Sequence, residues 1–291
     1  MKKNDLMEMV DLYLNVLSEN NILSLFVVIY LGLIFGSLMN VLSSRMVMME
    51  NINNIGIAKS IGKVSDKKLN SYFNKYKDYN LFNPKSSCPI CDYKIKWWQN
   101  IPVLGYILLR GKCYSCKSTI SLEYPIVELF ITVLFVTLFY IFGLSVEFIT
   151  YTILFYLLTL HILTDIKEKI LFDSVTLIIF MVLTFQLLAT GDLFLIKNSL
   201  ISAFSVYIIM YSLIYVYEKL RGIEYSFGRG DIKLIAVLSI PFNLDQLLSF
   251  ILIATFIGFV FFAALYLLKI KDKEIPFAPA IILSFVVNLI V

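Results

Sequence analysis

Long apolar runs separated by short polar turns are the feature that most restricts what this chain can fold into. Such runs occur at 22–42, 125–144, 148–165, 174–190, 197–217, 231–242, 246–268 and 276–291. About 20 apolar residues are enough to cross the hydrocarbon core as a helix, whose backbone groups bond to one another. The composition agrees, because only 16% of the 291 residues are charged, against about 25% in soluble domains. The sequence therefore predicts an all-α polytopic membrane protein with about eight transmembrane helices, the sixth and eighth of them short.

The positions of Lys and Arg predict how these helices are oriented. Thirteen of these residues lie between Arg45 and Lys117, within the one large polar segment. The turns at 166–170, 218–230 and 269–275 also contain them, whereas the turns at 145–147, 191–196 and 243–245 do not. Basic residues are enriched in cytoplasmic loops. We therefore expect the large segment and the basic turns to lie in the cytoplasm, with both chain ends on the other side.

Two polar stretches precede and follow the first apolar run. Residues 1–21 have a helix-like alternation of charged and apolar residues, which favours a segment lying along the membrane surface. Residues 50–87 are rich in Asn, Lys and Ser with little periodicity, and we expect a loop or loosely ordered insertion there. Small residues in the first run, Gly32, Gly36 and Ser37, favour close approach of another helix.

Two aspartates stand at the ends of apolar runs. Asp165 ends one run, and Asp231 opens another directly after Gly228 and Gly230. A charged group in a membrane segment costs about 2.5–3.5 kcal/mol on insertion scales, so it is a functional candidate by default. The predicted orientation puts both acids at the cytoplasmic edge, where they can form one catalytic pair. The two glycines would let an extended peptide approach the acid closely.

The same residues have other readings. A membrane aspartate can relay protons in a transporter as readily as it can catalyse hydrolysis. Lys233 either supports the site or anchors its helix at the membrane interface. His161, one turn before Asp165, either tunes that acid or is a packed, hydrogen-bonded residue of the bundle.

All four cysteines lie in two Cys-x-x-Cys pairs, separated by 21 residues. The pairs are Cys88 with Cys91 and Cys113 with Cys116. This spacing is typical of four thiolates around a structural zinc ion, and a reducing cytoplasm favours a metal over disulfides. The sequence therefore predicts a small zinc-ribbon-like module. Its neighbours Trp97 and Trp98 are expected to pack that module or to lie at the membrane interface.

These motifs occur together in one known family. The chain resembles the bacterial type IV prepilin peptidases, which are bifunctional leader peptidase/N-methyltransferases and GxGD membrane aspartyl proteases. The matching blocks, in order, are 36–41 with Arg45, 88–91, 100–104, 109–116, 120–128, 164–165 with Asp173, 228–234 and 276–279. The chain departs from the family pattern at Gly105, Phe172 and Ala278, where serine, proline and glycine are usual.

The resemblance implies an enzyme of the plasma (inner) membrane that processes prepilins or pseudopilins. Asp165 and Asp231 would cut the basic leader peptide on the cytoplasmic side. The cytoplasmic module would then methylate the new N-terminus with S-adenosylmethionine, a step with which Gly111 is associated. The expected partners are these substrates and membrane lipids, with no nucleic acid.

The implied domains are an N-terminal segment with the first transmembrane helix (1–45), a cytoplasmic loop with the four-cysteine module (46–120) and a membrane peptidase domain (121–291). Two alternatives stay open at this point. One is a peptidase whose cysteine module is only structural. The other is a proton-coupled transporter with a zinc-ribbon domain.

Overall fold

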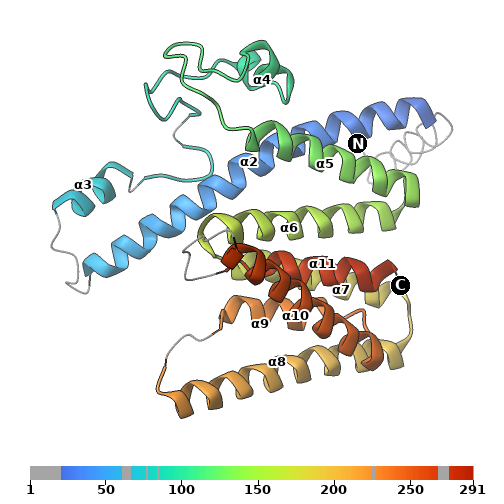
Figure 1. Cartoon of the computed structure of the whole chain (residues 1–291). Helices are drawn as coiled ribbons and strands as arrows, with labels where there is room; N and C mark the ends of the chain where they lie inside the picture. Colours follow the sequence, from blue (N-terminus) through green and yellow to red (C-terminus); the bar gives the residue numbers. More distant parts are fainter. Residues whose placement is uncertain are drawn as a thin grey trace, which may run out of the picture. The chain divides into compact units, whose positions relative to one another are not determined.

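The computed structural model describes residues 21–60, 67–76, 78–83, 85–223, 227–267 and 275–290 (Figure 1). The predicted surface segment 1–21, except for its last residue, and most of the basic turn 269–275 lie outside these residues. Within them, the regular elements are helices, accompanied by two isolated antiparallel β-bridges. The chain divides into two compact units, Met1–Thr152 and Ile153–Val291.

Eight apolar helices correspond to the eight predicted spans. They are α2 (Asn21–Ser60), α5 (Glu123–Phe142), α6 (Val146–Glu168), α7 (Asp173–Ala189), α8 (Leu193–Arg221), α9 (Arg229–Leu238), α10 (Leu244–Leu267) and α11 (Ala278–Ile290). Among the described residues, five of these helices (α2, α5, α6, α8 and α10) are long and apolar enough to cross a membrane, and α7, α9 and α11 are shorter. The all-helical, polytopic membrane fold is confirmed, including the short sixth and eighth helices.

The first unit is built on the pairing of α2 with α5, which lie side by side in Figure 1. Gly32 and Gly36 permit this close contact. A Cβ atom at Gly32 would lie 2.7 Å from the Cα of Thr132, and one at Gly36 would lie 2.6 Å from the Cα of Glu128. Larger residues would force the helices apart, as expected for small residues between membrane helices.

The helix α2 extends far beyond the predicted first span. Its last turns bury Val47 and Ile52, each 7% exposed. A second helix, α3 (Lys67–Tyr76), packs on it, and the ring of Phe73 lies 2.9 Å from where a Cβ at Gly56 would be. The expectation of an unstructured loop is therefore wrong for these two helical stretches. Tertiary contacts stabilise helices here that composition alone does not indicate.

A small module follows, between α3 and α5. It contains the 3₁₀-helix η1 (Trp97–Asn100) and the short helix α4 (Leu104–Leu108). Two isolated antiparallel bridges, Ser87 to Lys94 and Lys112 to Thr119, each close one of the cysteine pairs.

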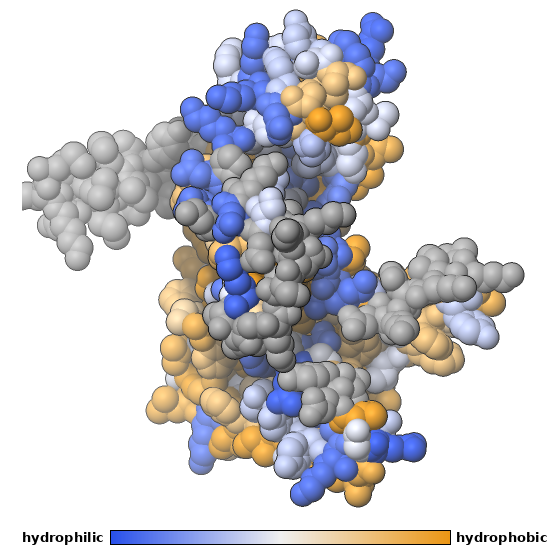
Figure 2. Space-filling view, turned by 90° about the vertical axis from the view of Figure 1, so that its left-hand side faces the viewer, coloured by the Kyte–Doolittle hydropathy of each residue, from blue (hydrophilic) through white to orange (hydrophobic). Residues whose placement is uncertain are grey.

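The second unit contains most of α6 and all of α7 to α11. Within it, α9 packs against α7, α8 and α11, and α10 packs against α11. Phe242, Phe250 and Phe285 form an aromatic centre. The ring centroid of Phe242 lies 5.4 Å from that of Phe250 and 5.6 Å from that of Phe285. The large side chains of Phe204, Phe256 and Phe259 are instead more than 60% exposed. Figure 2 shows apolar residues over much of the lower part of the visible face, as expected for a surface that contacts lipid.

Candidate active site

Asp165 lies in the last turn of α6 and is 4% exposed. Its Oδ2 accepts a hydrogen bond of 2.8 Å from the backbone N–H of Ala278, the first residue of α11. The backbone N–H of Phe277 is a further donor. Because the first N–H groups of a helix have no partner within it, the carboxyl group of Asp165 completes the N-terminus of α11. Sequence analysis did not find this contact, and its only signal was the matching block at 276–279.

Asp231 lies in the first turn of α9, three residues after the N-cap Gly228. Its Oδ2 lies against Gly228, where any Cβ atom would overlap it. Its Oδ1 is buried and has no hydrogen-bond partner within the described part of the chain. Gly228 has φ −61° and ψ 118°, a conformation open to any residue. Glycine is therefore needed at this position for space rather than for backbone freedom.

The two aspartates come from different helices and lie close enough for their charges to interact. Two neighbouring carboxyl groups do not both ionise readily, so they can share one proton. One carboxylate can then accept a proton from a water molecule while the protonated partner donates a hydrogen bond to a carbonyl oxygen. The arrangement suits hydrolysis of a peptide bond.

The neighbours of Asp231 fix the position of α9. A Cβ atom at Gly230 would lie 3.0 Å from the Cβ of Leu171, so the turn between α6 and α7 fits directly against α9. Lys233 donates to both carboxyl oxygens of Asp173 at 2.7 and 2.6 Å. Lys233 therefore joins α9 to the start of α7 through an exposed ion pair.

His161 is fully buried between α6 and α7. Its Nε2 lies 3.0 Å from the Oγ1 of Thr176, at hydrogen-bonding distance. Of the two readings of this histidine, the geometry matches a packed, hydrogen-bonded residue of the bundle.

The four cysteines form one cluster in the first unit. The Sγ atoms of Cys88, Cys91, Cys113 and Cys116 all lie within 4.8 Å of one another, and none forms a disulfide. Cys88 lies 3.8 Å from Cys116, and Cys91 lies 3.9 Å from Cys113. A tetrahedral ion with metal–sulfur bonds of about 2.3 Å would hold its ligands about 3.8 Å apart. The cluster can bind a metal ion.

The two cysteine pairs are local copies of one turn. In the first, the N–H of Cys88 donates to Tyr93 O, and in the second the N–H of Cys113 donates to Ser118 O. The residue after the second cysteine has a positive φ in both turns. Backbone N–H groups of Ile90 and Cys91 lower the pKa of the Cys88 thiol to about 6, which favours the thiolate that a metal requires.

Gly111 lies at a turn between α4 and the second cysteine pair. Its φ is +65°, and a Cβ atom there would lie 2.7 Å from the hydroxyl of Tyr106. Its carbonyl accepts from the N–H of Ile120 at 2.8 Å. The structure therefore gives Gly111 a role in shaping the module, since any side chain there would be strained and would displace the Tyr106 ring.

A buried carboxyl group attaches the module to α5, and sequence analysis assigned it no role. Glu128 is 8% exposed, and its Oε2 accepts a 2.6 Å hydrogen bond from the N–H of Val103. Nearby, the side chain of Asn40 on α2 donates to Tyr124 O at 3.0 Å. The signal available in the sequence was a glutamate within an apolar run.

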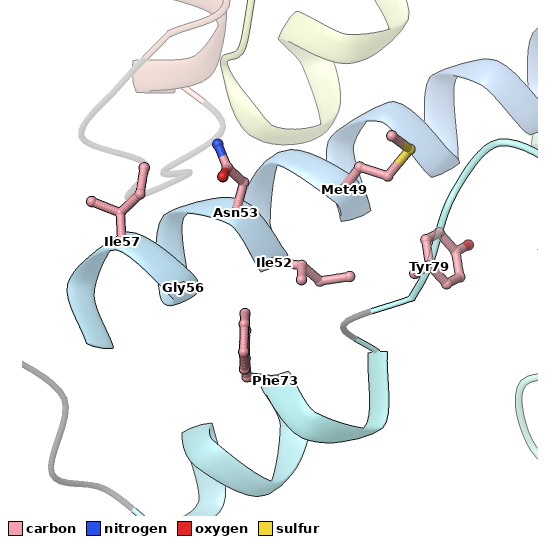
Figure 3. Close-up of a pocket in the computed structure, with 7 residues that line it drawn as sticks. All are labelled: Met49, Ile52, Asn53, Gly56, Ile57, Phe73 and Tyr79. Atoms are coloured by element: carbon pink, nitrogen blue, oxygen red, sulfur yellow. The ribbon is translucent and has the colours of Figure 1, made fainter. Parts of the chain in front are cut away.

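A cavity of about 470 Å³ lies between α2 and α3 (Figure 3). Its walls carry the aromatic rings of Phe73 and Tyr79 and the apolar side chains of Met49 and Ile52, with Asn53 as a polar group. Figure 3 shows Phe73 facing Gly56 and Ile52. The volume is in the range of small-molecule sites. It belongs to the first unit, whereas both aspartates belong to the second.

Comparison with known proteins finds two family models and several curated relatives. Residues 30–142 match the bacterial peptidase A24 N-terminal domain, and residues 152–263 match the type IV leader peptidase family. The chain is similar to a prepilin leader peptidase/N-methyltransferase of Neisseria gonorrhoeae, with 34% identity covering 92% of each chain. Similar proteins with the same description occur in Burkholderia pseudomallei (32% identity; 86% of this chain and 80% of the relative) and Vibrio cholerae (34%; 72% and 82%). No solved structure matches the chain.

Proposed function

The chain belongs to the family of prepilin leader peptidase/N-methyltransferases, and we propose that it cleaves the leader peptide of prepilins or pseudopilins and then methylates the new N-terminus. The observation that carries the peptidase part is the convergence of two acids, the buried Asp165 at the end of α6 and the half-buried Asp231 at the start of α9, whose charges interact. The matching block 276–279 supports it, because the backbone N–H of Ala278 holds Asp165.

In the proposed reaction, the ionised aspartate removes a proton from a water molecule while the protonated aspartate donates a hydrogen bond to the scissile carbonyl oxygen. The water oxygen bonds to the carbonyl carbon, and a tetrahedral intermediate forms. The C–N bond then breaks, the leaving amine takes up a proton from the pair, and the acid pair returns to its starting charge. Backbone donors at the N-terminus of α11 keep the Asp165 carboxyl group oriented throughout.

We place the cysteine module and the basic turns in the cytoplasm of a cell whose inner membrane holds the helices. The support is the distribution of Lys and Arg, which fill the large polar segment and the turns on one side only. Asp165 and Asp231 then lie on the side where the basic leader of a prepilin is located.

For methyl transfer, we assign a zinc ion to Cys88, Cys91, Cys113 and Cys116, where it would stabilise the fold of the module. S-adenosylmethionine would supply the methyl group. The cavity between α2 and α3 is our candidate for the adenosyl portion, since Phe73 and Tyr79 provide aromatic walls and the volume suits such a ligand.

Mass spectrometry of a prepilin incubated with the purified protein and S-adenosylmethionine tests both activities. We expect a shortened product that carries one added methyl group. Asp165→Ala and Asp231→Ala should each abolish shortening. Gly111→Ala should preserve shortening and reduce methylation, whereas normal methylation in this variant would favour a purely structural module. Proton-coupled uptake without any cleavage would support the transporter alternative.

A further inference from the structure

The short helix α4 presents an apolar face that no described part of the chain covers. Leu104, Ile107 and Leu108 are 56%, 60% and 66% exposed, at the spacing of one helix face. Trp97 of η1, which packs against the same segment, is 81% exposed. These four residues are called the α4 face below. Four large apolar side chains exposed side by side are unusual on a surface that contacts only water.

The attachment of α4 places this face beside the membrane-spanning part of the first unit. The residue before α4, Val103, donates its N–H to the Oε2 of Glu128 at 2.6 Å. Glu128 is the sixth residue of α5, so the contact lies about 7.5 Å along that helix from its first residue. Figure 1 shows α4 beside the N-terminal end of α5. The module is therefore held at the depth of the first turns of a membrane helix.

The start of α5 exposes apolar side chains of the same kind as those of the α4 face. At the start of α5, Leu122, Ile126 and Leu129 are 62%, 60% and 50% exposed. A helix that crosses the membrane exposes such residues to lipid. The α4 face thus adds apolar surface where lipid is already expected.

The charge around the face fits an anionic surface. Between residues 85 and 120 the chain has six Lys or Arg residues and a single acidic residue, Asp92. Lys94, Lys96, Arg110 and Lys112 are all exposed. Tryptophan and basic residues together are the usual side chains of a protein surface at the boundary between headgroups and acyl chains.

We propose that the α4 face inserts into the interfacial layer of the bilayer, with the surrounding basic residues on anionic lipid headgroups. The cysteine module would then lie on the membrane surface beside α5 instead of extending into the aqueous phase. This inference concerns lipid contact and does not depend on either proposed enzymatic activity.

The two tryptophans of the chain provide a direct test, because one lies on the face and the other does not. Trp98 packs edge-on against Tyr114, with ring centroids 5.9 Å apart. In Trp98→Phe, Trp97 is the single tryptophan, and Trp97→Phe is the matched control that reports on Trp98. Both proteins are reconstituted into vesicles of phosphatidylglycerol and phosphatidylcholine, with and without bromine on the acyl chains.

We expect the fluorescence of Trp97 to be quenched by the brominated lipid and not by acrylamide dissolved in the water. The fluorescence of Trp98 should be quenched less by the brominated lipid. Quenching of Trp97 by acrylamide but not by bromine would overturn the proposal. Protection from both quenchers would also overturn it, because the face would then be covered by protein, such as a second copy of the chain. Equal bromine quenching in pure phosphatidylcholine would refute the role of anionic headgroups.

A charged substitution tests the face itself. Ile107→Asp with Leu108→Asp should remove the bromine quenching of Trp97. Phe82→Asp is the control, since Phe82 is 86% exposed and lies outside the face. Unchanged quenching in the double variant, with the metal content of the module intact, would contradict the proposal.

Discussion

Gly228→Ala gives the sharpest test of how the acid pair is built. Gly228 has a backbone conformation that alanine adopts without strain, and it caps α9 without a side-chain hydrogen bond. Alanine should therefore fold normally, at a cost of no more than about 1 kcal/mol at a helix N-cap. Its Cβ, however, would occupy the space of the Asp231 Oδ2 atom. The carboxyl group must move for the methyl group to fit.

The expected size of the effect follows from that displacement. The Asp231 carboxyl group must move by about 1 Å before its distance to the new Cβ atom becomes an ordinary nonbonded contact. A misplacement of this size can lower a catalytic rate by about 100-fold. Initial rates of leader cleavage, followed by mass spectrometry, measure it. Gly230→Ala is the comparison that narrows the approach of the peptide without displacing the acid, because its Cβ would meet only the side chain of Leu171 at 3.0 Å. A folded Gly228→Ala protein with the wild-type rate would refute the assignment of Asp231 or the placement of its side chain.

Three other changes test the surroundings of the site and the module. Lys233→Ala breaks the ion pair with Asp173, in which the lysine side chain is 39% exposed and the aspartate side chain 70% exposed. The free energy of unfolding, measured by thermal denaturation, should therefore fall by about 1 kcal/mol or less. A much larger loss of stability would contradict this expectation. Glu128→Ala leaves the N–H of Val103 without its acceptor. Leaving this buried donor unsatisfied costs about 1–3 kcal/mol, so the amide of Val103 should exchange with deuterium roughly 5- to 150-fold faster than in the wild type. Glu128→Gln should exchange at nearly the wild-type rate. Equal exchange in all three proteins would contradict the hydrogen bond. Removing the proposed zinc ion with a chelator should unfold the cysteine module and stop methylation while cleavage continues, as followed by metal analysis and product mass. Loss of cleavage at the same rate as loss of methylation would contradict this separation.

The parts of the fold that depend on local sequence were predictable. Apolar runs located the eight helices of the described residues that correspond to predicted spans, and the short run at 231–242 became the ten-residue helix α9 with Asp231 in its first turn. The spacing of the cysteines likewise predicted the cluster, because each Cys-x-x-Cys pair closes its own turn.

The contacts between distant residues were not predictable from one sequence. Ala278 and Asp165 are 113 positions apart, and only the packing of α11 against its neighbours brings the donor to the acid. The extension of α2 was missed for a similar reason. Its polar composition resembles a loop, and the packing of Phe73 against Gly56 becomes visible only in three dimensions.

The lengths of the helices explain why the acids meet where they do. A membrane core of about 30 Å requires about 20 helical residues. With 10 and 13 residues, α9 and α11 reach only about 15 and 20 Å. The first N–H groups at these N-termini have no partner further along the same helix, and they lie at the positive end of the helix dipole, so they are available to polar groups within the second unit. One of these N-termini carries Asp231 and the other donates to Asp165. Shortened helices thus give the acid pair a polar environment in a unit that otherwise exposes apolar surface, and lengthening either helix at its N-terminus should disrupt the pair before it disrupts the fold.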